Sequence, residues 1–235
     1  MPLDIMAPSW DKGIGTRYAL MVYGPKAAQT NYYTEEQAAR LGLPLNYSAA
    51  INFALTAVNP RDAVGCFSRL RRNRFNKWAT RPTKGDGPAF APTYAYSFEN
   101  VREGVPFMTM NPGDPHNVHA HWALHLPASR AYDFENHLWE WVAEMTGGIT
   151  GGAETIMVKP YVRVSYFVKA AKPFVAKKYG RGQPSEPQGI IIGRRADTSR
   201  NLGPTARRAY DRELGIKRWL PSRQPLAAHQ PAQHA

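Results

Sequence analysis

Alternation of apolar and polar positions along the chain predicts strands separated by helices. Four segments have strand-like patterns: residues 51–58, 93–101, 118–126 and 156–164. Four others have helical spacing or helix-start signals: residues 34–42, 60–80, 132–145 and 166–172. A further short apolar run at residues 18–23 also favours a strand. The central order strand, helix, strand, strand, helix, strand predicts an α+β fold with a ferredoxin-like βαββαβ core, a central antiparallel sheet and helices on one face.

The strand predicted at residues 118–126 divides its side chains sharply between two faces. Successive side chains of a strand point to opposite faces. One face therefore holds Val118, Trp122, Leu124 and Leu126, and the other holds His119, His121, Ala123 and His125. The apolar face is expected to pack under helices. The histidine face is either a solvated polar surface or a metal site.

Two imidazoles placed two residues apart can bind one metal ion, but they need a further ligand. Glu99 lies at the end of the aromatic strand predicted beside the histidine strand. We therefore take Glu99 as the third ligand of the metal ion, together with His119 and His121. Such a set leaves coordination positions open for catalysis. The mixed nitrogen and oxygen donors suit Mn²⁺ or Mg²⁺, although Zn²⁺ would also bind.

Tyr166 and Lys169 are spaced to share one face of a predicted helical turn. Tyrosine is a poor nucleophile because its pKa is near 10. An adjacent cation and a metal-polarised phosphate can together make its attack feasible. This spacing is common on ordinary helix surfaces, and it gains meaning from its position after the histidine strand.

The net charge of +12 over 235 residues indicates a polyanionic partner. Basic and aromatic side chains alternate in the helix predicted at residues 60–80, which would combine phosphate contacts with base stacking. The predicted contacts of this helix are Arg69, Arg71, Arg72, Arg74 and Lys77. Arg194 and Arg195 form a second basic group. The alternative interpretation of the helix is a solvated face.

The sequence contains neither a secretory signal nor an apolar run of 18 residues, so it predicts a cytoplasmic protein without membrane contact. Cys66 is the single cysteine, which excludes an intramolecular disulfide. It is expected to be a small buried residue in a helix.

These motifs together resemble those of the HUH (His-hydrophobic-His) endonucleases, and in particular the single-tyrosine rolling-circle replication initiators of plasmids and filamentous phages. Residues 51–58 look like the first motif, His119-Ala120-His121 like the metal motif, and residues 166–169 like the Tyr-x-x-Lys motif. Residues 188–203 are similar to a segment that follows these motifs. The resemblance spans residues 48–208. It implies an N-terminal extension (1–47), a nicking domain (48–208) and a basic, partly disordered tail (209–235).

The resemblance implies a five-stranded antiparallel sheet with the metal and the tyrosine on one face. Tyr166 would attack a phosphodiester in single-stranded DNA, assisted by Lys169, with Tyr161 as the other candidate nucleophile. The products would be a 5′-phosphotyrosine link and a 3′-hydroxyl that can prime synthesis. The implied partners are a single-stranded origin or hairpin, a host helicase and a polymerase.

Two other interpretations of the same sequence remain open. A non-catalytic module of the RNA-recognition type would stack unpaired bases on Tyr94, Tyr96 and Phe98. A metal-dependent hydrolase would instead attack with activated water and leave no covalent protein–DNA product. Metal-dependent cleavage of DNA would exclude the non-catalytic module. A covalent protein–DNA adduct would exclude the hydrolase and favour the tyrosine enzyme.

Overall fold

The computed structural model describes residues 25–82, 87–100, 117–160, 189 and 191–217. Of the predicted elements, the strand at 18–23 and the helix at 166–172 lie outside these residues.

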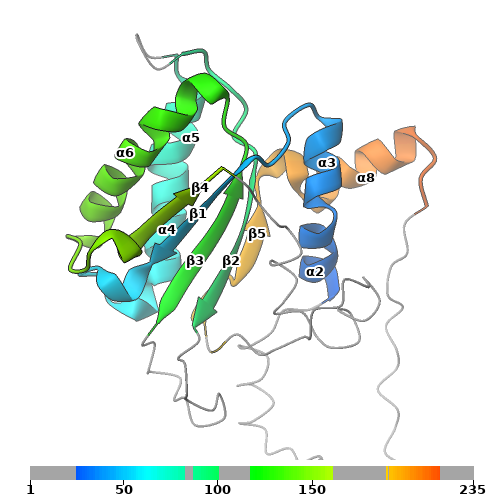
Figure 1. The fold of residues 1–235 in the computed structure, drawn as a ribbon. Coiled ribbons are helices and arrows are strands. Elements are labelled where there is room, and N and C mark those ends of the chain that lie inside the picture. Colours follow the sequence, from blue (N-terminus) through cyan, green and yellow to red (C-terminus); the bar gives the residue numbers. More distant parts are fainter. Residues whose placement is uncertain (1–24, 83–86, 101–116, 161–188, 190, 218–235) are drawn as a thin grey trace, which may run out of the picture.

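In the described part of the chain, one antiparallel sheet of five strands forms the centre (Figure 1). Its strands are β1 (Tyr47–Asn52), β2 (Tyr94–Asn100), β3 (Val118–Leu124), β4 (Ile156–Lys159) and β5 (Ala196–Thr198). They lie in the order β4-β1-β3-β2-β5, and every neighbouring pair is antiparallel. Strands β1 to β4 follow one another along the chain as a βαββαβ unit, which confirms the predicted α+β fold and its core.

A layer of helices covers one face of this sheet: α4 (Ala63–Leu70), α5 (Asn76–Thr80) and α6 (Ala128–Thr146) (Figure 1). The Trp122 ring of β3 packs at centroid distances of 4.7 Å from Phe75 and 5.3 Å from Phe67 of this layer. The predicted apolar face of β3 is confirmed, because Val118, Trp122, Leu124 and Leu126 are all buried. No helix among the described residues combines the length and apolarity needed to cross a membrane.

Three further helices gather beside β5: α2 (Pro25–Tyr32), α3 (Thr34–Arg40) and α8 (Pro204–Glu213) (Figure 1). The Arg207 guanidinium of α8 donates to the Gln29 carbonyl of α2 at 3.3 Å and lies over the Tyr33 ring. Residues 25–40 therefore pack with the C-terminal part of the domain. Described residues on both sides of the predicted boundaries at residues 47 and 208 thus pack together, and the boundaries themselves stay a prediction.

The structure differs from the strand predicted at residues 51–58 and from the continuous helix predicted at residues 60–80. The strand predicted at residues 51–58 is β1, which starts earlier and ends at Asn52. The Asn52 side chain accepts a hydrogen bond from the Ala54 amide at 3.0 Å, which turns the chain into the 3₁₀ segment Phe53–Leu55. The helix predicted at residues 60–80 contains a π-helical turn, Arg71–Phe75, between α4 and α5.

Candidate functional site

His119 and His121 lie on β3, the middle strand of the sheet, and point away from the α4–α6 layer. This follows from strand alternation, because Ala120 and Trp122 face that layer and are fully buried. Pairing of β2 with β3 places Glu99 directly across from His119. Paired residues of an antiparallel sheet share a face, so Glu99 joins the two histidines. The strand register therefore brings the three residues onto one face of the sheet.

The closest contact in this group joins the carboxylate to the second histidine. His121 Nε2 lies 3.3 Å from Glu99 Oε2, and the His119 and His121 rings are nearly parallel with centroids 6.3 Å apart. The His121 side chain is 24% exposed and that of Glu99 is 11% exposed, so His121 reaches the surface and Glu99 is largely buried. His125, beyond the end of β3, instead places its Nδ1 2.9 Å from the Pro44 carbonyl oxygen.

The His119 ring is held by the backbone of the residue two positions before it. His119 Nδ1 lies 2.9 Å from the Asn117 carbonyl oxygen, which can only accept, so Nδ1 carries a proton and donates. Burial lowers the pKa of His119, and the Asn117 contact opposes that effect in part. A neutral imidazole protonated at Nδ1 keeps its lone pair on Nε2, which is the form that binds metals.

The donor set of His119, His121 and Glu99 suits a divalent ion in chemistry and in placement on one face. Within the described ranges, no three His, Cys, Asp or Glu side chains already lie close enough together to hold an ion. The structure therefore shows a histidine–carboxylate pair with a second histidine beside it, and metal binding stays a prediction. Tyr161, Tyr166 and Lys169 lie outside the described residues, so the predicted nucleophile also stays a prediction.

The basic helix predicted to contact DNA lies in the α4–α6 layer, across the sheet from the histidines. Arg69, Arg72 and Lys77 are exposed there, and Arg74 forms an ion pair with Glu144 of α6. This surface and the histidine face would therefore bind different phosphates of a DNA strand. Any strand that contacts both must pass around an edge of the sheet.

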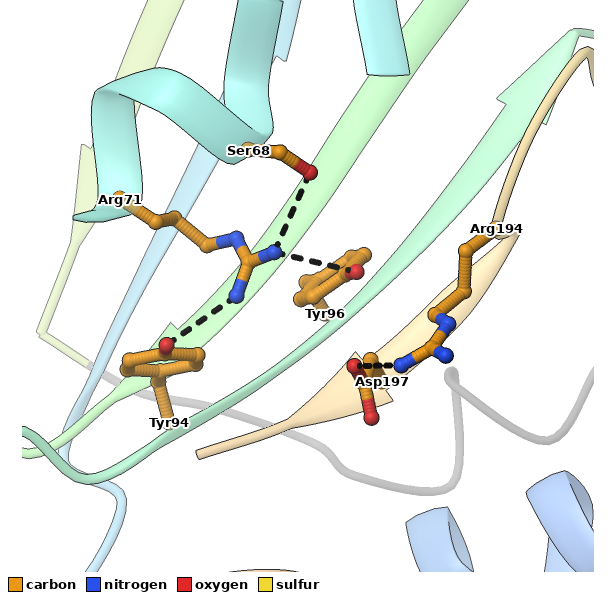
Figure 2. A network of polar contacts seen from close by, with 6 residues as sticks. All are labelled: Ser68, Arg71, Tyr94, Tyr96, Arg194 and Asp197. Carbon is orange, nitrogen blue, oxygen red and sulfur yellow. Dashed lines mark hydrogen bonds and ion pairs between the residues drawn. The ribbon is translucent and has the colours of Figure 1, made fainter. Parts of the chain in front are cut away.

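Arg71 is a correction to the predicted DNA-contacting set. The π-helical turn directs its side chain inward, where it donates to Tyr94 Oη at 3.1 Å, Tyr96 Oη at 3.2 Å and Ser68 Oγ at 3.4 Å (Figure 2). Its guanidinium carbon also lies 4.2 Å from the Tyr96 ring centroid. Arg71 is 7% exposed, so the hydrogen bonds of its two terminal nitrogens are made inside the protein.

The aromatic side chains of β2 occupy the same buried layer. Tyr94, Tyr96 and Phe98 are at most 5% exposed, and they face α4 on the side opposite the histidines. Burial raises the pKa of Tyr96 to about 12, although the Arg71 charge opposes this rise. Rings enclosed in this way cannot stack on unpaired bases, so the stacking surface of the RNA-recognition interpretation is absent at these three residues.

The second predicted basic pair is divided in the structure. Arg194 is exposed and forms a 2.6 Å ion pair with Asp197 of β5 (Figure 2). Arg195 is buried, donating to the Phe98 carbonyl at 2.8 Å and to the Gly189 carbonyl. Arg195 therefore joins the segment before β5 to the end of β2 that bears Glu99, and it too leaves the predicted DNA-contacting set.

The two faces of the sheet thus have different chemistry. His119, His121 and Glu99 lie on one face, and Arg71 with its tyrosine partners lies beneath α4 on the other. Asn117, which orients His119, had no signal in the sequence because its role depends on a backbone carbonyl. Comparisons of the chain with protein-family models, with curated proteins and with solved structures found no match.

Proposed function

We propose that this chain is a metal-dependent enzyme that nicks and rejoins single-stranded DNA through a tyrosine, in the manner of the HUH initiators. The observation that supports the proposal best is the meeting of Glu99 with His119 and His121 on one face of the middle strand. The order of the strands and the motifs of the sequence agree with it. The buried aromatic residues of β2 count against the non-catalytic alternative.

In this proposal, His119, His121 and Glu99 hold the divalent ion, either Mn²⁺ or Mg²⁺. When bound, such an ion would withdraw negative charge from a phosphate oxygen. The protein's part is to present its ligands in the right form. The Asn117 carbonyl keeps the His119 proton on Nδ1, and the partly exposed His121 would be the ligand that a DNA strand approaches.

The nucleophile in this proposal is Tyr166, with Tyr161 as the other candidate. The tyrosyl oxygen forms a bond to phosphorus and loses its proton, the bond from phosphorus to the 3′-oxygen breaks, and that oxygen takes a proton to become a 3′-hydroxyl. Lys169 would stabilise the phenolate. The reverse attack by a 3′-hydroxyl rejoins a strand and frees the tyrosine.

The substrate in this proposal is the single-stranded origin or hairpin of a plasmid or phage. Strand separation and synthesis would come from a host helicase and polymerase in the cytoplasm. The exposed Arg72 and Lys77 would then bind flanking phosphates on the helical side of the sheet.

The test uses the full chain, labelled single-stranded oligonucleotides and Mn²⁺, with products separated on a denaturing gel. We expect cleavage and a labelled band at the mass of protein joined to DNA, both dependent on Mn²⁺. His119→Ala or His121→Ala should abolish both products. His137→Ala is the matched control, because His137 lies on α6 and contacts Glu140 far from the proposed centre.

Three outcomes would overturn parts of the proposal. Cleavage without a covalent adduct would replace the tyrosine with activated water. An adduct that persists in Tyr166→Phe and maps to Tyr161 would change the nucleophile. Binding without any cleavage, in the presence of either metal, would refute the enzymatic function.

A further inference from the structure

Residue 117 is held in place by a side chain from the neighbouring strand. The Asn117 amide donates to Asn100 Oδ1 at 3.2 Å, just before the pairing of β2 with β3 begins. Its carbonyl oxygen accepts from His119 Nδ1 at 2.9 Å. The backbone of a single residue therefore connects the Asn100 side chain to the His119 ring.

Asn100 is itself fixed on both sides. It is 1% exposed and ends β2, one residue after Glu99. Gly189 packs so closely on it that a Cβ atom at position 189 would overlap the Asn100 carbonyl oxygen. Arg195 keeps Gly189 there by donating to its carbonyl and, at 2.8 Å, to the carbonyl of Phe98. A change of position of Asn100 would therefore require movement of several buried groups.

We propose that Asn100 is a positioning residue that sets the tautomer of His119, acting through the backbone of Asn117 and supported by Gly189 and Arg195. The consequence for metal binding rests on the proposed function, whereas the effect on the tautomer does not. With Asn117 held, its carbonyl faces Nδ1, and the lone pair stays on Nε2. Without the Asn100 acceptor, the Asn117 amide loses this hydrogen bond, and His119 can take the Nε2-protonated form that imidazole side chains favour in water.

The tautomer is measured directly by long-range ¹H–¹⁵N NMR of the histidine rings, on metal-free protein at mildly alkaline pH. We expect His119 of the unmodified chain to be protonated at Nδ1. Asn100→Ala should move it towards the Nε2-protonated form. Asn100→Asp keeps the acceptor oxygen and should retain the original tautomer. In calorimetry with Mn²⁺, Asn100→Ala should bind about 10- to 100-fold more weakly, as for outer-shell partners of metal ligands.

Asn46→Ala is the matched control for loss of stability. Asn46 makes two hydrogen bonds to the Leu126 backbone, at 2.8 and 2.9 Å, beyond the opposite end of β3. It should destabilise the protein without changing the His119 tautomer. A His119 tautomer that is the same in Asn100→Ala and in the unmodified chain would overturn the proposal, as would an equal change in Asn46→Ala. An Nε2-protonated His119 in the unmodified chain would overturn it without any variant.

The two proposals fail separately. A chain that shows the Asn100-dependent change of tautomer but binds no Mn²⁺ would refute the metal site and confirm the positioning role. If Mn²⁺ bound equally well with and without the Asn100 side chain, and the His119 tautomer did not change, the positioning role would be refuted. The metal site would be confirmed.

Discussion

Arg130 offers the sharpest test of how the helical layer is held together. It lies in the first turn of α6 with no exposed surface. Its guanidinium donates to the carbonyl oxygens of Trp78 at 2.8 Å, Gly87 at 3.1 Å and Arg81 at 3.5 Å. It also lies 4.2 Å from the Trp78 ring centroid. One cation thus joins α6 to the end of α5 and to the segment that leads towards β2.

The magnitude follows from the two short contacts. Arg130→Met removes the charged donor from the two shorter hydrogen bonds, those to the partly buried Trp78 and Gly87 carbonyls, at about 1–3 kcal/mol each. It also removes the desolvation penalty of the buried charge, so we expect a net loss of about 2–4 kcal/mol in the free energy of unfolding. Arg130→Lys keeps the charge, but an ammonium cannot span the same carbonyls as the planar guanidinium. We therefore expect the lysine variant to lose at least as much as the methionine variant.

The assay is urea unfolding of the full chain with linear extrapolation, comparing midpoints at an unchanged slope. Arg72→Met and Arg72→Lys are the controls, because Arg72 is exposed and makes one local contact with the Ser68 carbonyl. Each should change stability by less than about 0.5 kcal/mol. If Arg130→Lys were as mild as Arg72→Lys, the bridging geometry of Arg130 would be refuted.

Three other predictions follow from buried or exposed groups. Burial raises the pKa of Tyr96 from 10 to about 12, so the folded state keeps the phenol proton at pH values where the unfolded state loses it. The free energy of unfolding should therefore decrease by roughly 3 kcal/mol as the pH rises from 10 to 12. Tyr96→Phe should remove this part of an alkaline unfolding profile, and an unchanged profile would contradict it. Gly189→Ala should unfold at lower urea than Gly42→Ala, since both have φ of +70° but only Gly189 meets a backbone atom. Equal midpoints would refute that close approach. Replacing Arg72 and Lys77 by Gln should reduce the slope of log DNA affinity against log salt concentration by about 0.9 for each lost phosphate contact. An unchanged slope would exclude this surface as a site of DNA binding.

The parts of the fold that the sequence predicted are those governed by local periodicity. The two faces of β3 followed from alternation alone, which correctly placed Trp122 inside and His119 and His121 together. The order of strands and helices then fixed the core, because a βαββαβ chain has few ways to bury its apolar faces. Glu99 was found because the end of one strand of a hairpin lies beside the start of the next.

The parts that were missed depend on contacts between distant residues or on a local change of period. Arg71 belongs to a run of basic residues, and only the π-helical turn directs it towards Tyr94 and Tyr96. Arg195 looks the same as Arg194 in the sequence, yet it alone reaches the Phe98 carbonyl. No periodic pattern distinguishes these cases. Arg195 and Arg130 both donate to backbone carbonyl oxygens, and a sequence does not indicate which carbonyl a side chain will reach.

The docking of α2 against α8 has a consequence for synthesis on the ribosome. Gln29 and its partner Arg207 are separated by 178 positions. At a translation rate of about 5–20 residues per second, roughly 9–36 s pass between the appearance of the two. During that interval the buried polar side chains of α2 and α3 have no α8 to receive them, whereas β1, β2 and β3 can already pair. Helices α2 and α3 are therefore among the last of the described elements to reach their final place.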